Sequence, residues 1–227
     1  MLLAYQIKYS VRYYTPMVAN DITLRQSAEH LAANDPLLGP VIERVGLCTI
    51  RPHNNYYQEL VDSIIGQQLS VKAAATILKR FKELFGEEFP SPEQILSKDV
   101  EELRSAGLSR AKAMYVRDLA QHVVDGRVKF DHLDSLSNDE IIRELTDIKG
   151  VGEWTAHMFM MFCMGRLDVL AHGDLGIKNG IQRLYGLKKQ PDAAAIQRLA
   201  KKYRWHPYET VACWYIWQSL DNAPATA

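Results

Sequence analysis

Apolar residues recur at helical spacing along most of the chain, and this pattern leaves little room for a sheet. The clearest stretch is 56–85, where the apolar positions include Leu60, Ile64 and Phe81. Gly66 and two glutamines interrupt this stretch, so we expect two helices separated by a short break. Recurrence every three to four residues is typical of helices that bury one face, whereas strands alternate. The sequence therefore predicts an all-α protein of roughly ten helices.

Residues that cap helices stand where the apolar periodicity begins. Ser137 is followed three positions later by Glu140, which matches the capping box, in which each side chain bonds the other residue's backbone. Ser91 precedes Pro92, a residue favoured in the first turn, and Ser70 stands where the second helix of 56–85 begins. These positions predict where individual helices start.

The chain divides into three parts by composition. Residues 1–20 form an N-terminal extension, and its stretch IKYSVRYY is the only material that favours an extended segment. Residues 21–220 contain no long linker, and we expect them to form a single unit. Residues 221–227 end in NAPATA, which predicts a frayed tail.

Composition narrows the function classes. No stretch approaches the ~18 uninterrupted apolar residues of a membrane span, and the N-terminus lacks the features of a signal peptide. The three cysteines, Cys48, Cys163 and Cys213, are odd in number and lack metal-ligand spacing, which favours a reduced intracellular compartment and buried thiols. The 27 basic and 27 acidic residues cancel, and this excludes a protein that coats nucleic acid by positive potential alone.

The stretch IKGVGEWTAHMF, residues 148–159, predicts a tight turn between two helices. Gly150 and Gly152 would let a phosphate approach the backbone, and the new helix would point its unpaired N–H groups and its dipole at that phosphate. The alternative is a helix–helix turn that needs glycine for steric reasons only. On this motif alone both interpretations stay open.

The stretch LTDIKGVGEWTAHMFMMF, followed by DVLAHGDLGIKNGI, resembles the helix-hairpin-helix superfamily of DNA glycosylases, and within it the 3-methyladenine DNA glycosylase II (alkylbase) group. The resemblance extends to SIIGQQLSVKAA and to RWHPYETVACWYIW, so it covers most of the unit from 21 to 220. No single motif is specific, but their combination in this order is. The resemblance implies a two-lobed all-α glycosylase fold. The middle lobe takes about 55–168 with the hairpin at 145–157, and the second lobe takes 21–54 and 169–220.

The resemblance implies that Asp174 is the catalytic residue, while Asp168 resembles a structural acid in the same loop. A fixed carboxylate would stabilise the oxocarbenium-like sugar that forms as the base departs. It would also orient the attacking water. The alternative is that Asp174 only caps the helix that follows. Both roles are compatible, because a cap holds the carboxylate in one orientation.

In relatives that also cut the DNA strand, a lysine stands at the position of Trp154. The resemblance therefore implies a monofunctional enzyme without lyase activity, because a Schiff base requires that amine. It also implies that Trp154, Trp214 and Tyr215 form the base pocket, where an electron-rich aromatic cleft favours a cationic alkylated purine. The alternative for each aromatic residue is a place in the core.

Further contacts with DNA follow from the same resemblance. Gln68 matches the side chain that is inserted into the duplex when a base is flipped out; a polar loop between two helices is the alternative. The DNA backbone would be held by Gly150, Gly152, Lys149 and Thr155 of the hairpin. An auxiliary backbone contact would come from residues 107–112.

No cofactor is expected, since the four late cysteines of an iron–sulfur cluster are absent from the sequence. Family hairpins bind one monovalent cation, so Na+ or K+ would be held by the carbonyls of Thr146, Ile148 and Val151. The pair Leu175–Gly176 replaces an aromatic residue that some relatives carry after the aspartate, which predicts a roomier pocket.

The sequence thus predicts a monofunctional glycosylase that removes N3- or N7-methylated purines from double-stranded DNA in base excision repair. We expect a monomer without membrane contact, cytoplasmic in a prokaryote or nuclear in a eukaryote. The alternatives are a glycosylase for other damaged or deaminated purines and a catalytically silent DNA-binding module. A helical protein-interaction domain would leave the hairpin and the aspartate loop unexplained.

Overall fold

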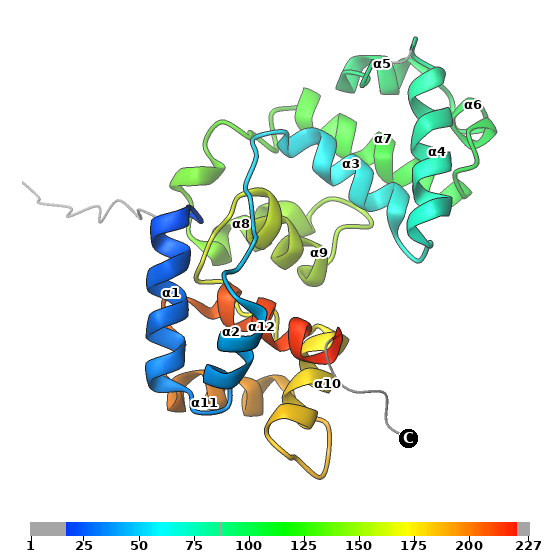
Figure 1. Ribbon diagram of the computed structural model, residues 1–227. Helices are drawn as coiled ribbons and strands as arrows, with labels where there is room; N and C mark the ends of the chain where they lie inside the picture. Colours follow the sequence, from blue (N-terminus) through cyan, green and yellow to red (C-terminus); the bar gives the residue numbers. More distant parts are fainter. Residues whose placement is uncertain (1–16, 87, 222–227) are drawn as a thin grey trace, which may run out of the picture.

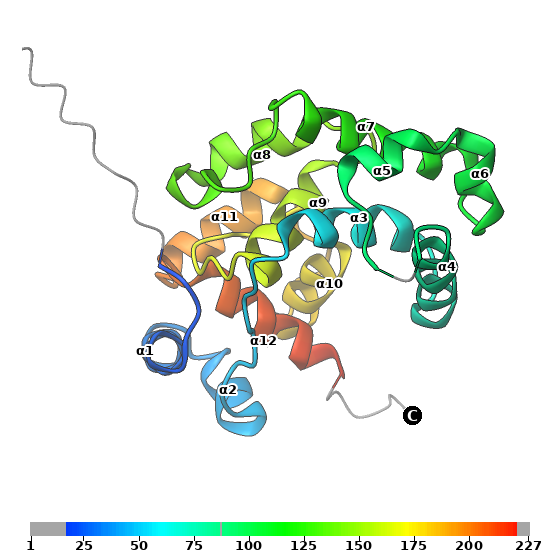
Figure 2. The same cartoon turned by 90° about the horizontal axis from the view of Figure 1, so that it is seen from above.

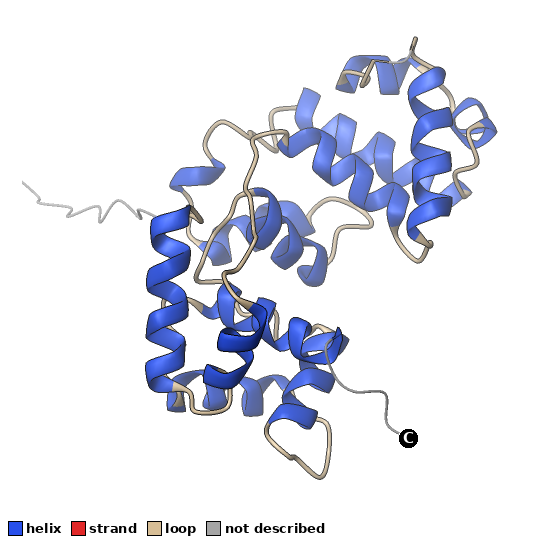
Figure 3. Ribbon diagram, viewed as in Figure 1, coloured by secondary structure: helices blue, strands red, loops and turns tan. Residues whose placement is uncertain are grey.

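The computed structural model describes residues 17–86 and 88–221, and within these residues the secondary structure is helical (Figure 3). No strand is formed in these two segments, which confirms the predicted all-α class. None of their helices is both long enough and apolar enough to cross a membrane. The helices are α1 (Asp21–Asn34), α2 (Gly39–Val45), α3 (Tyr56–Gly66), α4 (Val71–Glu83), α5 (Pro92–Ser97), α6 (Val100–Ser105), α7 (Arg110–Val124), η1 (Leu133–Ser135), α8 (Asn138–Thr146), α9 (Glu153–Met158), the π-helical turn η2 (Phe159–Cys163), α10 (Leu175–Leu184), α11 (Ala193–Lys202) and α12 (Glu209–Asp221).

Two groups of helices pack mainly among themselves. Helices α3 to α9 form one group, in which α7 contacts α3, α5 and α6, while α8 contacts α9. In the second group α12 contacts α1, α2 and α10. Figures 1 and 2 show the extended connection from α2 to α3 running from the second group to the first. The predicted helix break within 56–85 is the loop between α3 and α4.

The predicted helix starts are confirmed. Ser70 and Ser91 each accept a hydrogen bond from the backbone N–H three residues later, and Ser137 with Glu140 forms a complete capping box. Each such cap contributes ~1 kcal/mol, and its bonds join near neighbours, so these boundaries depend on local sequence.

The expected extended segment and the expected frayed tail fall on residues that the structure does not describe, apart from Asp221. At the start of the described chain, Val18 forms an isolated antiparallel bridge with Arg166. The N–H of Ala19 also donates to the carbonyl of Gly165 at 2.8 Å. The backbone before α1 is therefore tied to the segment that follows η2.

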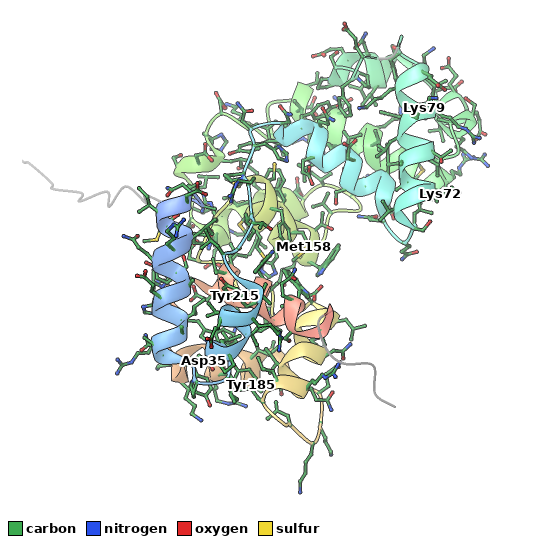
Figure 4. The ribbon with its side chains drawn as sticks, viewed as in Figure 1. Asp35, Lys72, Lys79, Met158, Tyr185 and Tyr215 are labelled. Carbon is green, nitrogen blue, oxygen red and sulfur yellow. The ribbon has the colours of Figure 1, made fainter. Side chains whose placement is uncertain are left out.

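The buried carboxylate of Asp35 holds the second group of helices together. It accepts hydrogen bonds from the backbone N–H of Leu37 at 3.0 Å, from the Trp205 indole at 2.8 Å and from the Tyr185 hydroxyl. Figure 4 shows Asp35 and Tyr185 close together within this group. Because a buried charge is tolerated only when it is well bonded, these contacts fix the corner after α1 against the ends of α10 and α11.

Candidate active site

Asp174 stands at the N-cap of α10. Its Oδ1 accepts a hydrogen bond from the backbone N–H of Ile177 at 2.8 Å, and its own N–H donates to the carbonyl of Ala171 at 3.0 Å. The predicted capping role is therefore confirmed. The cap also orients the carboxylate, since one oxygen is committed to the helix end.

Two indole N–H groups bind the same carboxylate. Trp154 Nε1, from α9, donates to Oδ2 at 2.7 Å, and Trp217 Nε1, from α12, donates to Oδ1 at 2.9 Å. An indole N–H can only donate and a carboxylate oxygen accepts, so the two bonds hold the carboxylate from two sides. The three helices α9, α10 and α12 thus converge on one fixed negative charge.

Trp217 was missed by the sequence interpretation, which chose Trp214 and Tyr215 on the same helix. A signal was available, because Trp217 lies three residues after Trp214 and helix positions three apart share a face. Two aromatic residues at this spacing predict an aromatic stripe on α12. They do not predict which member of the stripe reaches Asp174.

Gly176 lets Trp217 come this close. A Cβ atom at Gly176 would lie 2.8 Å from Trp217 Nε1 and 3.0 Å from Asp174 Oδ1. The predicted roomier pocket at Leu175–Gly176 is therefore wrong at Gly176, because the indole of Trp217 fills that space. Leu175 itself is 63% exposed.

A cleft of about 770 Å³ opens in front of Asp174. Trp154 lies in its wall with 49% of its surface exposed, although it is a large apolar side chain. An exposed aromatic wall beside a partly buried polar group is typical of a ligand site. The cleft is lined by Ser63, Gly66, Gln67, Gln68, Leu69, Trp154, Thr155, Asp174 and Leu175.

The structure contradicts the predicted pocket role of Tyr215. Its side chain is fully buried, and its hydroxyl donates to the carbonyl of Gly46 at 2.9 Å. Figure 4 shows it inside the second group of helices. Trp214 is half-buried, packs edge-on against Tyr215 and is not among the residues that line the cleft. No base can stack on Tyr215, so of the three predicted aromatic residues the cleft receives only Trp154.

Gln68 lies at the break between α3 and α4, at the edge of the cleft, and is exposed. Its φ of 58° is unusual for a residue with a side chain. The neighbouring Gln67 holds this loop in place, because its Nε2 donates to the carbonyl of Gly150 at 2.8 Å. Lys112 Nζ donates to the carbonyls of Ile65 and Gln67 at 2.8 and 2.5 Å. The loop that presents Gln68 is thus tied to the glycine turn.

The two glycines of the turn differ in surroundings. Gly150 has a φ of +85°, and a Cβ there would lie 2.3 Å from the ring of Tyr115. Gly152 caps α9 with an ordinary φ of −99°, and a Cβ there would meet no atom within 4 Å. Gly150 is therefore required by the fold, whereas Gly152 leaves the start of α9 open to an approaching group.

Lys149 and Thr155 of the hairpin differ in their exposure. The backbone N–H of Lys149 donates to Asp118 at 2.9 Å, and the ammonium group pairs with the same carboxylate at 3.3 Å. The Lys149 amide is thus occupied, while its side chain remains 71% exposed. Thr155 is only 4% exposed and lines the cleft, and its contact with the DNA backbone stays a prediction.

The loop before Asp174 packs against α9. His172 Nε2 lies 3.6 Å from Glu153 Oε1, and its ring meets the ring of His157 edge to face. Burial lowers the pKa of His157. These contacts hold the loop that carries Asp174 against the helix that carries Trp154.

Comparison with known proteins agrees with this geometry. Residues 61–205 match the HhH-GPD superfamily of base excision DNA repair proteins, and the chain belongs to this family. The match takes in the glycine turn, Asp174 and the α3–α4 break.

Individual relatives cover nearly the whole chain. The DNA-3-methyladenine glycosylase 1 of Schizosaccharomyces pombe is 33% identical over 90% of this chain and 91% of its own length. The crystal structure of a DNA-3-methyladenine glycosidase from Bacillus halodurans is 41% identical, with a TM-score of 0.78 over 86% of this chain and 89% of its own. The S. pombe 3-methyladenine DNA glycosylase bound to abasic DNA is 32% identical, with a TM-score of 0.76 over 89% of this chain and 100% of its own.

Replacing Trp217 with phenylalanine is expected to slow base release about 10- to 100-fold, because one hydrogen bond to a charged group is lost. The phenyl ring keeps the packing against Phe162, whose ring centroid lies 5.8 Å from that of Trp217. Single-turnover rates measure the effect, and binding to abasic DNA should be unchanged. Trp214→Phe is the matched control, since Trp214 has no contact with Asp174 among the described hydrogen bonds. Equal rates for both variants would show that the second indole does not position the carboxylate.

Proposed function

We propose that this protein is a monofunctional DNA glycosylase that hydrolyses the N-glycosidic bond of N3- and N7-alkylated purines in duplex DNA. One observation carries the proposal: a single carboxylate, Asp174, is held by two indoles at the wall of a cleft of about 770 Å³. The names of the relatives, which describe 3-methyladenine glycosylases, support the same substrate class.

The chemistry follows from the charge of the substrate. A purine alkylated at N3 or N7 is cationic, so it leaves as a neutral base without prior protonation, and the bond electrons go with it. Its positive charge favours a place against the exposed Trp154 ring through cation–π attraction. The sugar that remains approaches an oxocarbenium ion, which the Asp174 carboxylate stabilises. Water then adds to C1′, and its proton passes to the carboxylate or to solvent.

Absence of lyase activity is part of the proposal. No lysine is among the residues that line the cleft in the described chain, and the position in front of Asp174 is an indole. The nearest hairpin amine, Lys149, is paired with Asp118 at 3.3 Å. Without a free amine at C1′ no Schiff base forms, so the product is an abasic site in an intact strand.

Binding of duplex DNA would use the open start of α9. The exposed backbone at Gly152 offers N–H groups to a phosphate, and Gln68 would enter the gap left by the flipped nucleotide. The carbonyl of Ile148 already accepts from the N–H of Val151 at 3.0 Å, which leaves its second lone pair for the predicted Na+ or K+. The carbonyls of Thr146 and Val151 would complete that site. The monomeric state and the location, cytoplasmic in a prokaryote or nuclear in a eukaryote, stay predictions.

Release of free bases from methylated duplex DNA tests the proposal. The wild-type protein is expected to release 3-methyladenine and 7-methylguanine, and the strand should stay uncut until alkali is added. Borohydride should trap no covalent complex. Strand cleavage without alkali would overturn the monofunctional assignment. If the protein releases only hypoxanthine or other neutral purines, the proposed substrate class of alkylated purines is wrong.

A further inference from the structure

Three side chains with metal-binding atoms converge outside the cleft, and none of them lines it. His53 comes from the connection between α2 and α3, Glu59 from the first turn of α3, and Cys163 from the end of η2. One ligand atom from each residue lies within 4.8 Å of the other two. The base-release chemistry uses none of them.

The backbone holds two of these residues face to face. The N–H of His53 donates to the carbonyl of Cys163 at 2.9 Å, although the residues are 110 positions apart. Pro52 packs so closely on Gly165 that a Cβ at this glycine would lie 2.7 Å from the proline ring. Cys163 ends a π-helical turn, a feature that is frequent at functional sites. The imidazole and the thiol therefore meet through fixed main chain.

The atomic arrangement suits a tetrahedral ion. His53 Nδ1 lies 3.6 Å from Cys163 Sγ. Bond lengths of 2.0–2.1 Å to nitrogen and 2.3 Å to sulfur at tetrahedral angles separate two zinc ligands by about 3.6 Å. Nδ1 accepts a hydrogen bond from the N–H of Asn55 at 3.3 Å, which identifies it as the ring nitrogen that carries the lone pair, and a bound ion would take the place of this bond.

Glu59 completes the set. Its Oε2 lies 3.4 Å from His53 Nε2, and one of its oxygens lies within 4.8 Å of the ligand atoms of both other residues. Its side chain is 40% exposed, so it would reach an ion bound between the imidazole and the thiol by rotating about its own torsions. The exposed sides of His53 and Glu59 leave a fourth position open to water.

We propose that His53, Glu59 and Cys163 form a binding site for one Zn2+ or a similar borderline-soft divalent cation. A thiolate, an imidazole and a carboxylate together favour zinc over magnesium or calcium, which prefer oxygen ligands alone. The ion would link the connection between α2 and α3 to η2. This turn continues directly from α9. Its role is to stiffen the support of Trp154, and it takes no part in bond cleavage.

Cobalt is the probe, because Co2+ reports its ligands by colour. The reduced, chelator-treated wild-type protein should bind one Co2+ with a thiolate-to-cobalt charge-transfer band and the intense visible bands of tetrahedral cobalt. Addition of Zn2+ should remove both and raise the melting temperature. Cys163→Ser should abolish the charge-transfer band. His53→Gln and Glu59→Gln alter half-exposed side chains and should weaken binding by at least about tenfold while the protein stays folded.

Two variants serve as matched controls. Cys48→Ala removes another buried thiol from the same connection, and His132→Gln removes a histidine paired with Glu144 at 3.2 Å without a thiol nearby. Both should leave the cobalt spectrum unchanged. A wild-type protein without the charge-transfer band, or a band that survives in Cys163→Ser, overturns the site. Base release plays no part in these readouts, so failure here leaves the glycosylase proposal standing, and the reverse also holds.

Discussion

Asp174→Asn is expected to reduce base release by at least about 100-fold, because the variant loses the one charged side chain among the described residues that line the cleft. The amide also places an N–H₂ group where one of the two indoles donates, so a donor meets a donor. Asparagine remains a good helix cap, so α10 should persist. Quantified free bases and circular dichroism measure the two effects separately.

Asp192→Asn is the matched control for this substitution. Asp192 caps α11 in the same way, accepting from the N–H of Ala195 at 2.7 Å, but it is not among the residues that line the cleft. The Asp192→Asn variant should release bases at the wild-type rate. Asp174→Asn should still bind abasic-site DNA. If Asp174→Asn releases bases at the wild-type rate, the carboxylate is only a cap and base release does not depend on it. If the wild type releases no base yet binds DNA, the protein acts as a binding module.

Among the substitutions considered for this protein, Gly150→Ala is expected to lower the free energy of unfolding most. The alanine would be held at a φ of +85° with its Cβ 2.3 Å from the Tyr115 ring. A left-handed conformation costs ~1–2 kcal/mol, and overpacking adds ~1–3 kcal/mol. Each kcal/mol lowers the melting temperature by about 2–4 °C in a chain of this length. Thermal melting should show this fall, and DNA binding should weaken because the turn can no longer form.

Gly152→Ala separates folding from DNA contact. Its φ of −99° suits alanine and its Cβ meets no atom within 4 Å, so the melting temperature should not fall. The added methyl group nevertheless stands at the open start of α9, where a phosphate would approach. Binding to abasic DNA should therefore weaken without loss of stability. Unchanged binding by Gly152→Ala would show that the duplex contacts a different part of the surface.

Much of the fold could be predicted from local sequence patterns. The caps at Ser70, Ser91 and Ser137 fix helix starts through bonds within four residues, so no tertiary information is needed. The same is true of Asp174, whose capping bond reaches only Ile177. The glycine turn was predicted in place as well, although the reason for Gly150 is the ring of Tyr115, which no local pattern reveals.

The sequence could not predict which aromatic side chains of α12 face Asp174, and the reason is physical. Helix α12 carries apolar residues on nearly every side, so periodicity cannot indicate which side faces the cleft. The rotation of this helix is set by close packing of Ile216 on Gly180 and by the bond from Tyr215 to Gly46. Those contacts bury Tyr215 and turn Trp217 toward Asp174.

The sequence by itself determined the helices, their starts, the glycine turn and the position of the carboxylate, because these depend on bonds between near neighbours. Only the tertiary structure decided which indoles hold that carboxylate and which polar side chains meet at a distance. His53 and Cys163 illustrate the limit, since 110 positions separate them and the cysteine spacing gave no metal signal. Contacts between remote segments depend on how helices rotate and pack, and that is a property of the whole core.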